Sequence, residues 1–298
     1  MRITFGQGFD DGVRSINTAA AQLVDAQRRV SSGRRLNVPS DDPAGTAAAV
    51  GARSSLAAVD AYRRATDAAS SRLLVADTAL SDVINQLIAA KVAAVNASGS
   101  GKSQAQRDAL STQILSIRES VLADMNTRFG STYLFAGAAS SQPPFVTLSG
   151  GGVSAYQGDA VAQSIDIEEG RDVEITFDGG AIMQGADTTH IFDELTALAA
   201  AVQAGDGAGI QAGIAAIDRA FDRSTLAQTH VGLALRTLED IRPHLDAVRL
   251  SSLTRVSAIE DADMAKAMTD LARAETAQQA ALGAFATVSR LTLMDYLR

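Results

Sequence analysis

The chain has 298 residues, of which 46% are hydrophobic and only 4% aromatic, and it contains no Cys and no Trp. Its apolar residues are mostly Ala, Leu, Val and Ile, a composition typical of long helices that pack side by side. The formal net charge is -8, and Lys91, Lys102 and Lys266 are the only lysines, so no basic face is available for nucleic acid.

The N-terminal residues Met1 to Phe9 lack the basic start and the apolar run of a secretory signal. We expect no membrane contact, because no segment approaches the roughly 20 apolar residues that a membrane span needs. From the residues alone, the protein is predicted to be cytoplasmic. The absence of Cys fits any compartment, since such a chain neither requires oxidation nor suffers from it.

The first predicted element is a helix that ends near Gly33. From Phe9 onward its apolar residues alternate in steps of four and three, which is the spacing of a coiled-coil seam. Pro39 disfavours helix at the residue before it, which supports an end ahead of this point. The predicted seam consists of Phe9, Val13, Ile16, Ala20, Leu23 and Val30, with Gln27 as its polar member.

A short joint follows this helix and precedes a much longer one. Ser40, Asp41 and Asp42 offer cap oxygens and negative charge to the first turn of the next helix. Pro43 stands where its missing N–H costs nothing. We predict a hinge between two helical domains, formed by Asn37, Pro39, Ser40, Asp41, Asp42 and Pro43.

After the joint, an Ala-rich start leads into an unbroken heptad seam, and the flexible residues 96–101 end this helix. Ser103 and Gln106 form a capping box that starts the next helix. We expect the two helices to form an antiparallel hairpin. The predicted buried residues are Leu73, Ala76, Leu80, Val83, Leu87, Ala90 and Ala94 in the first helix, and Leu110, Ile114, Ile117, Val121 and Met125 in the second.

The pattern changes between Ala136 and Asp187, where Gly and Pro become frequent and alternation replaces the heptads. The segments 164–168 and 173–177 alternate apolar and polar residues as strands do. This predicts a small β-rich insertion at the tip of a hairpin, with few contacts to the helical core.

Helical periodicity returns over 187–204, stops at the glycines of 205–209, and continues in the longest seam, through Ile259. Pro243 lies inside that run, and we expect it to kink the helix. A last helix begins at Asp261 and reaches the C-terminus. Its predicted seam is Met264, Met268, Leu271, Ala274, Ala281, Phe285 and Val288, followed by Leu291, Leu293 and Tyr296.

These elements predict a mainly α protein, a long antiparallel helical bundle or coiled coil with paired N- and C-terminal helices and a small β-rich insertion. The expected parts are a terminal domain (1–36 and 262–298), a central bundle (43–135 and 188–260) and the insertion (136–187). Because the terminal seams contain many small residues that bury little area, neighbouring molecules are expected to cover them. The predicted assembly interface is Phe9, Val13, Ile16, Leu23, Val30, Leu271, Phe285, Val288, Leu291, Leu293 and Tyr296.

No pattern in the sequence predicts catalysis, a cofactor or a metal. The segment 96–103 resembles a phosphate-binding loop, but it begins with Asn96 instead of Gly and follows a helix where that motif requires a strand. The acidic residues of 166–172 lack the spacing of a calcium loop. The three histidines show neither a zinc pattern nor a nucleophile motif.

Two motifs carry a resemblance to a known family. The joint Ser32-Gly33-Arg34-Arg35-Leu36-Asn37-Val38-Pro39-Ser40-Asp41-Asp42-Pro43-Ala44-Gly45 resembles the signature near the start of bacterial flagellins and flagellar hook-associated proteins. The segment 259–265 resembles their C-terminal counterpart. Within this superfamily the hook-associated branch is the better match, because of Ser40-Asp41-Asp42-Pro43, the 133–137 segment and the ending at 293–298.

The resemblance implies a secreted structural protein, exported unfolded through the flagellar type III apparatus and assembled at the junction between hook and filament. It reverses the cytoplasmic prediction. The implied partners are further copies of the chain in a ring or tube, an adjacent hook-associated protein, flagellin and an export chaperone. The alternatives are a flagellin that forms the filament itself, a cytoplasmic coiled-coil adaptor and, resting on the phosphate-like loop alone, a nucleotide-dependent enzyme.

Overall fold

The computed structural model describes residues 2–99 and 101–296, and the side chains of residues 1–6, 8 and 288–298 lie outside the described part. It divides into two compact units. The terminal unit comprises Met1–Ala58 and Ala247–Arg298, and the central unit comprises Val59–Asp246. The two units divide at 58/59 and 246/247, within two long helices, and the insertion belongs to the central unit. The division at the joint that the sequence suggests stays a prediction.

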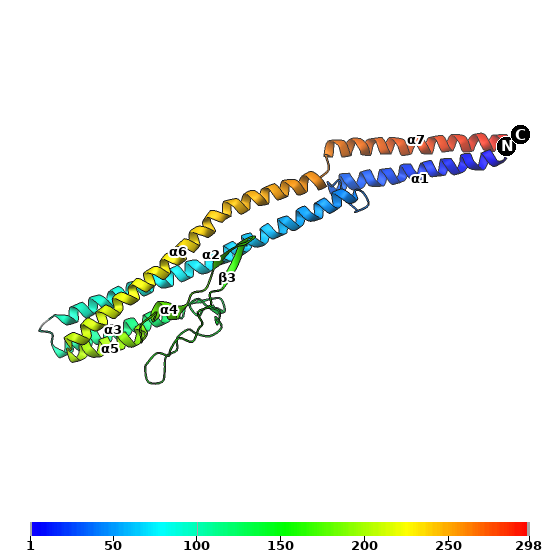
Figure 1. Cartoon of the computed structure of the whole chain (residues 1–298). Helices are drawn as coiled ribbons and strands as arrows, with labels where there is room; N and C mark the ends of the chain where they lie inside the picture. The colour runs from blue at the N-terminus through cyan, green and yellow to red at the C-terminus, as the bar shows by residue number, and fades with distance from the viewer. Residues whose placement is uncertain (1, 100, 297–298) are drawn as a thin grey trace. The chain divides into compact units, whose positions relative to one another are not determined.

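In the terminal unit, α1 (Arg2–Ser32) packs against α7 (Met264–Tyr296), and the two helices lie side by side (Figure 1). The first helix ends as expected, because Gly33 takes a φ of 67° that a residue with a side chain rarely adopts. The last helix begins where the Asp263 Oδ1 atom accepts hydrogen bonds from the backbone N–H groups of Ala265 and Lys266, at 3.0 and 3.2 Å.

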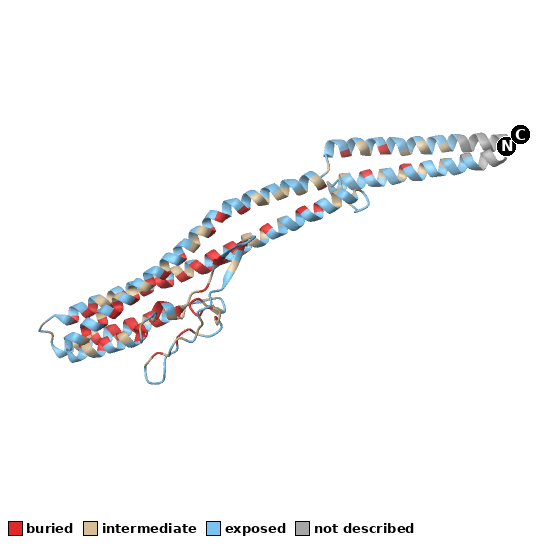
Figure 2. Cartoon of the chain, in the orientation of Figure 1, coloured by how far each residue is buried: buried red, intermediate tan, exposed pale blue. Residues whose placement is uncertain are grey.

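Long heptad helices build the central unit, as the sequence predicts. They are α2 (Pro43–Ser98), α3 (Gln104–Met125), α5 (Ile191–Ala204) and α6 (Gly207–Glu260). The helices α2 and α3 run antiparallel, and the capping box of Ser103 and Gln106 is present (Figure 1). Buried residues line the facing sides of the bundle (Figure 2), including Leu73, Leu80, Leu87, Ile114, Phe192, Leu195, Val231 and Leu238.

Helix starts differ from the prediction by a few residues. The helix expected from Asp187 starts at Ile191, because His190 acts as its N-cap and its Nδ1 atom accepts the N–H of Asp193 at 3.3 Å. The helix α6 starts at Gly207, inside the expected break at 205–209, and continues past Pro243 to Glu260. The kink expected at Pro243 stays a prediction.

The insertion contains two strands where the sequence predicts them, although the second covers 171–174 and not 173–177, and the sequence pattern did not reveal the other short elements. Strands β3 (Ser164–Glu168) and β4 (Arg171–Glu174) pair antiparallel, with Ile165 opposite Val173. A second, two-residue hairpin, β1 (Arg128–Phe129) and β2 (Thr132–Tyr133), precedes the predicted insertion. A short helix, α4 (Gly179–Met183), follows the strands, and Asp178 caps it. Two-residue strands are too short to show alternation, and a five-residue helix is too short to show the helical period.

The insertion is fastened to the bundle, which corrects the expectation of few contacts. The Arg72 Nε atom of α2 donates to the carbonyl of Ile175 at 2.7 Å. On α6, the His244 Nε2 atom lies 3.0 Å from the Glu168 Oε1 atom of β3. Phe145 packs edge-on against Phe192 of α5, with 5.0 Å between ring centroids. The insertion therefore belongs to the folded core of the central unit.

The helix α2 is long and apolar enough to cross a membrane when judged by length and composition alone. This corrects the expectation that no segment approaches such a span. A core helix of a soluble protein passes the same test, and the seam of α2 is buried within the protein.

Candidate assembly interface

The contact between α1 and α7 is a narrow seam of mostly small residues. In α1 the positions turned toward α7 follow one heptad series in steps of four and three. Ala19 and Ala26 are the buried members, and the larger residues of the series are only half-buried. The series consists of Gly12, Ile16, Ala19, Leu23, Ala26 and Val30.

The facing series in α7 has the same spacing and a similar mixture of sizes. Ala267 and Ala274 are buried, and the remaining members are half-buried. At the far end, Phe285 packs against Phe9 with 5.1 Å between ring centroids. A Cβ atom at Gly12 would lie 2.6 Å from the Phe285 ring, so glycine permits this approach. The series consists of Ala267, Leu271, Ala274, Gln278, Ala281 and Phe285.

The structure corrects part of the predicted seam. Ile16, Leu23, Val30, Leu271 and Phe285 occupy it as expected. Four other predicted seam positions are exposed, namely Val13, Gln27, Met264 and Met268. Gly12, Ala26 and Ala267, each one residue before Val13, Gln27 and Met268, lie in the seam instead. Phe9 touches Phe285 yet remains 53% exposed. The predicted interface residues Val288, Leu291, Leu293 and Tyr296 lie outside the described side chains.

Among the described side chains of the two terminal helices, the ion pairs lie within one helix and do not join α1 to α7. These pairs include Arg14 with Asp11 at 3.8 Å and Arg28 with Asp25 at 3.4 Å. Exposed pairs of this kind contribute about 0.3–0.5 kcal/mol each. A hollow of about 320 Å³ between the helices is lined by Ala26, Ala274 and polar neighbours. The pair therefore buries little apolar area and leaves large side chains at its surface.

Hydrogen bonds within the joint organise it as a compact loop. Asp42 caps α2 as predicted, because its Oδ1 atom accepts the N–H of Gly45 at 2.8 Å. Asp41 does not cap that helix; its Oδ2 atom accepts the N–H groups of Asn37 and Val38, both at 3.0 Å. These backbone donors lower the pKa of Asp41, and the N–H of Gly45 with the side chain of Arg35 lowers the pKa of Asp42.

The joint is also bonded to the turn between α6 and α7. The N–H of Arg35 donates to the carbonyl of Glu260 at 2.7 Å, and its guanidinium donates to the carbonyl of Ile259 at 2.8 Å. Arg34 pairs with Asp261 in an isolated antiparallel bridge. The N–H of Ala262 donates to the carbonyl of Gly33 at 2.9 Å. The two motifs that the sequence singled out are therefore in direct contact.

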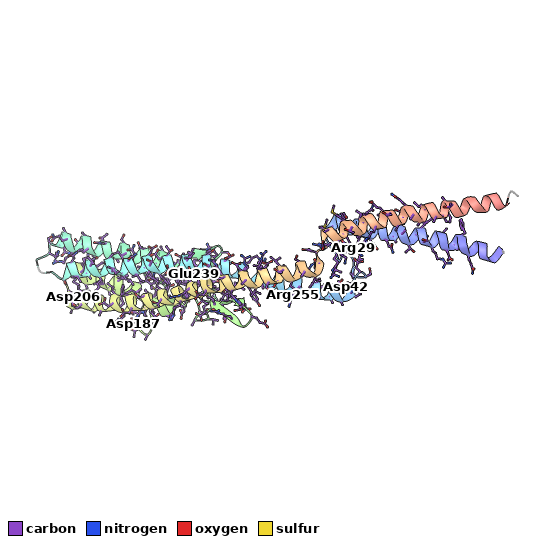
Figure 3. The ribbon with its side chains drawn as sticks, turned by 90° about the horizontal axis from the view of Figure 1, so that it is seen from above. Arg29, Asp42, Asp187, Asp206, Glu239 and Arg255 are labelled. Carbon is purple, nitrogen blue, oxygen red and sulfur yellow. The ribbon has the colours of Figure 1, made fainter. Side chains whose placement is uncertain are left out.

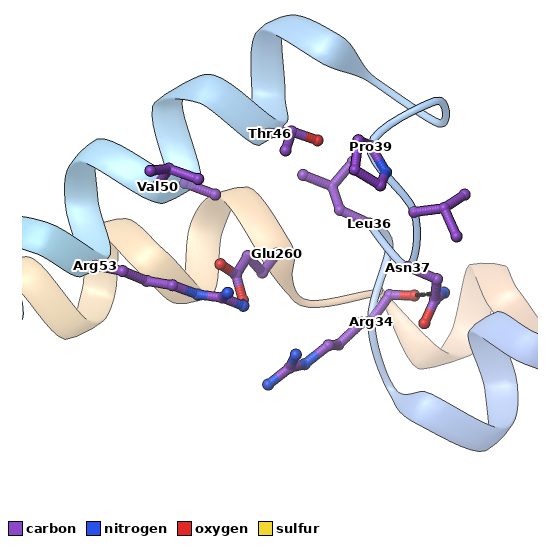
Figure 4. Close-up of a pocket in the computed structure, with 10 residues that line it drawn as sticks. Arg34, Leu36, Asn37, Pro39, Thr46, Val50, Arg53 and Glu260 are labelled. Carbon is purple, nitrogen blue, oxygen red and sulfur yellow. Dashed lines mark hydrogen bonds and ion pairs between the residues drawn. The ribbon is translucent and has the colours of Figure 1, made fainter.

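A pocket of about 220 Å³ lies beside the joint (Figure 4). Leu36 and Pro39 of the loop line it together with Val50 of α2. Arg53 and Glu260 lie side by side in it and form an ion pair of 2.5 Å. The Glu260 carboxylate is 6% exposed and its Arg53 partner is 52% exposed. This pair helps fasten α2 to the end of α6.

The other candidates of the sequence lie on separate elements of the described structure. Within the described residues, no group of three or more His, Asp or Glu side chains could hold a metal ion. The phosphate-like segment lies where α2 ends and α3 begins, a connection between helices. One charge cluster that sequence reasoning missed joins Asp187, which is labelled in Figure 3, to two arginines of α6. Asp187 lies 2.9 Å from Arg219 and 2.8 Å from Arg223. It fastens the segment after α4 to the bundle.

Comparison with known proteins identifies the helical parts of the chain. Residues 12–140 match the bacterial flagellin N-terminal helical region, and residues 214–297 match the bacterial flagellin C-terminal helical region. The matched ranges include both the joint and the turn that contacts it. The sequence is 24% identical to flagellar hook-associated protein 3 of Escherichia coli strain K12, over 99% of this chain and 99% of that protein.

Solved structures show the same fold. The crystal structure of FlgL from Xanthomonas campestris superposes with a TM-score of 0.62 at 15% identity, covering 68% of this chain and 98% of that one. The flagellar junction protein FlgL from Legionella pneumophila superposes with a TM-score of 0.58 at 14% identity, covering 72% of this chain and 100% of that one.

Proposed function

The chain belongs to the bacterial flagellin family, and from this premise we propose that it is a structural component of the bacterial flagellum that forms the junction between hook and filament. The observation that carries the proposal is the end-to-end match with flagellar hook-associated protein 3, which spans 99% of both chains. A flagellin of the filament itself is the alternative within the family.

The terminal seam supports an assembling protein. Ordering a residue costs about 1–2 kcal/mol in backbone freedom, and burial returns about 25 cal/mol per Å² of apolar surface. Ala19, Ala26, Ala267 and Ala274 return little of this cost because their side chains are small. In a ring or tube, neighbouring copies would cover the exposed sides of α1 and α7, so that folding of the terminal helices becomes coupled to assembly.

The joint then acts as the boundary between a conditionally folded part and a permanently folded one. Asp42 caps the α2 side, while Asp41 shapes the loop that follows α1. In this role the hinge residues Asn37, Pro39, Ser40 and Pro43 set the direction in which the terminal pair leaves the joint.

The family relationship also supports a route and a set of partners. We propose export through the flagellar type III apparatus, with a chaperone that holds the C-terminal region unfolded before secretion. The partners in the assembled flagellum are further copies of the chain, an adjacent hook-associated protein and flagellin. The role is architectural, and we propose no catalytic turnover and no required cofactor or metal.

Deletion of the gene tests the function. We expect cells that retain the hook and release flagellin into the medium, with attached filaments restored by the parent gene. If the purified protein alone grows long filaments, or deletion leaves hook and filament joined, the junction role is wrong. A protein found only inside motile cells would instead indicate a cytoplasmic adaptor.

A further inference from the structure

The terminal unit contains a buried carboxylate with one unused oxygen, at the point where α6 ends. The Glu260 side chain is only 6% exposed, and its Oε2 atom pairs with Arg53 of α2. Its Oε1 atom is buried and accepts no hydrogen bond from the described residues. A buried carboxylate oxygen without a donor has lost its hydration and gained no replacement, which destabilises the folded state. The atom therefore marks a place for a hydrogen-bond donor.

A cation without a partner lines the same pocket. Arg34 of the joint and Glu260 both line the pocket of about 220 Å³, and Figure 4 shows the Arg34 side chain extending from the loop. The backbone of Arg34 is bonded to Ser32 and Asn37, but its guanidinium has no hydrogen bond or ion pair among the described residues. A guanidinium carries several N–H donors and no acceptor. One pocket thus holds an unused acceptor and an unused donor.

The neighbouring donors of the loop are already engaged. The guanidinium of Arg35 donates to the carbonyl of Ile259 at 2.8 Å and to the Oδ2 atom of Asp42 at 3.3 Å. The side-chain amide of Asn37 donates to the carbonyl of Arg34 at 3.0 Å. Among the described basic residues of this loop, Arg34 is therefore the one whose side chain is free to move.

The backbone holds Arg34 beside Glu260. Arg34 pairs with Asp261 in an isolated antiparallel bridge, and the N–H of Arg35 donates to the carbonyl of Glu260 at 2.7 Å. Turning the long Arg34 side chain into the pocket therefore requires rotation about its side-chain bonds and no change in the backbone pairing.

We propose that Arg34 is a latch, whose guanidinium turns into the pocket and donates to the Oε1 atom of Glu260. In the structure this latch is open. When it closes, one carboxylate lies between Arg53 of α2 and Arg34 of the joint, so that three segments distant in the sequence meet at a single group. Arginine suits this position because its planar fork pairs with a carboxylate through parallel hydrogen bonds.

The latch gives the joint a role before assembly. The inference rests on the proposed function, in which α1 and α7 fold only when neighbouring copies cover them. The backbone bonds from Arg35 to Glu260 and from Ala262 to Gly33 lie where α1 ends and α7 begins. A closed latch keeps these bonds formed while the helices are unfolded, so that both helices start from one fixed register. Because starting a helix is the costly step in its formation, a fixed starting point favours folding on assembly.

Amide hydrogen exchange of the monomer tests the latch at the two bonds that it protects. The reporters are the N–H groups of Arg35 and Ala262. We expect Arg34→Ala to accelerate the exchange of both amides about tenfold, the low end of what a hydrogen bond to a charged group contributes. Arg34→Lys should recover part of the protection, because lysine keeps the charge without the planar fork.

A second substitution assigns the effect to the proposed pair. In a Glu260→Gln background, Arg34→Ala should cause no further acceleration, because the ion pair is already lost. Arg255→Ala removes an exposed arginine of α6 in the same unit, and as the matched control it should have no effect. An equal effect of Arg34→Ala in both backgrounds would show that Arg34 acts on another group. No effect in either would show that Arg53 or water holds the open oxygen, and both results overturn the latch.

Released flagellin separates the latch from the junction role. Cells with Arg34→Ala or Glu260→Gln should release more flagellin than the parent, and the double variant should be no worse than the stronger single variant. If these cells keep their filaments while deletion cells shed them, the latch inference fails and the junction role stands. If deletion cells also keep their filaments, the junction role is wrong, and the amide measurements still decide whether the latch closes.

Discussion

The seams of the central bundle and of the terminal pair have the same heptad spacing, but the central seam buries large side chains and the terminal seam buries small ones. In α2 the seam positions Leu73, Leu80 and Leu87 are fully buried large residues. In α1 the buried positions are Ala19 and Ala26, while Ile16 and Leu23 are only half-buried. Spacing thus decides that a helix pairs, and side-chain size together with the number of covering helices decides whether the pair is stable alone.

The largest effect should come from a charge placed in the central seam. We expect Leu80→Asp and Leu238→Asp each to destabilise the monomer by several kcal/mol, because both side chains are fully buried and a carboxylate there would have no partner. Urea unfolding followed by circular dichroism measures the change. The exposed neighbours Leu74→Asp and Leu233→Asp are the controls, and four equal unfolding midpoints would show that the seam is misassigned.

A second effect separates the two regions by hydrogen exchange. In the dilute monomer we expect fast exchange over residues 9–30 and slow exchange over residues 73–94, because only the second segment lies in a seam of large buried residues. Protection of residues 9–30 should appear after assembly. Equal protection of both segments in the monomer, or terminal helices that resist limited proteolysis, would contradict coupled folding and assembly.

The sequence predicts those parts of the architecture in which large apolar residues mark the buried side of a helix. The seam of α2, the apolar side of α5 and the capping box at Ser103 appear where expected, since each has a strong local signal. The seam of α1 is predicted only in part: Ile16, Leu23 and Val30 lie in it as expected, but its other members Gly12, Ala19 and Ala26 are less apolar than Val13 and Val24 outside it. When the buried residues are small, the most apolar series is a poor guide to the contact side.

In the candidate assembly interface too, the sequence locates the local motifs but not the contacts between distant residues. The sequence locates the joint and its C-terminal counterpart, yet it does not show that they touch through Arg34, Arg35 and Asp261. The contacts of Arg72, His244 and Asp187 likewise join residues far apart in the chain, and none has a periodic signal. They explain why the insertion, expected to be a loose addition, packs into the central unit.

A moderate effect should follow from removing the charge cluster at Asp187. Arg223 and Arg219 lower the pKa of Asp187 below its usual 3.8, so the cluster stabilises the folded state above that pH and is lost as the pH falls through the lowered value. We expect Asp187→Asn to cost about 1 kcal/mol at neutral pH, the size of a partly exposed ion pair. The difference from the parent in urea unfolding should disappear in acid, and a difference that persists there would exclude a charge effect.

The smallest effect concerns the joint, where the loop that follows α1 and the start of α2 depend on adjacent carboxylates. Asp41 accepts the N–H groups of Asn37 and Val38, and Asp42 accepts the N–H of Gly45. Asp41→Ala should therefore accelerate amide exchange at 37 and 38 and leave residue 45 protected, while Asp42→Ala should do the reverse. Because backbone donors hold the pKa of both groups below the usual 3.8, the bonds should be intact above pH 3.8 and weaken only as the pH falls through the lowered values. The two variants together test whether the joint has separate halves, one belonging to the terminal pair and one to the bundle. If either substitution exposes all three amides at neutral pH, the joint opens as a single unit and the boundary proposed within it is wrong.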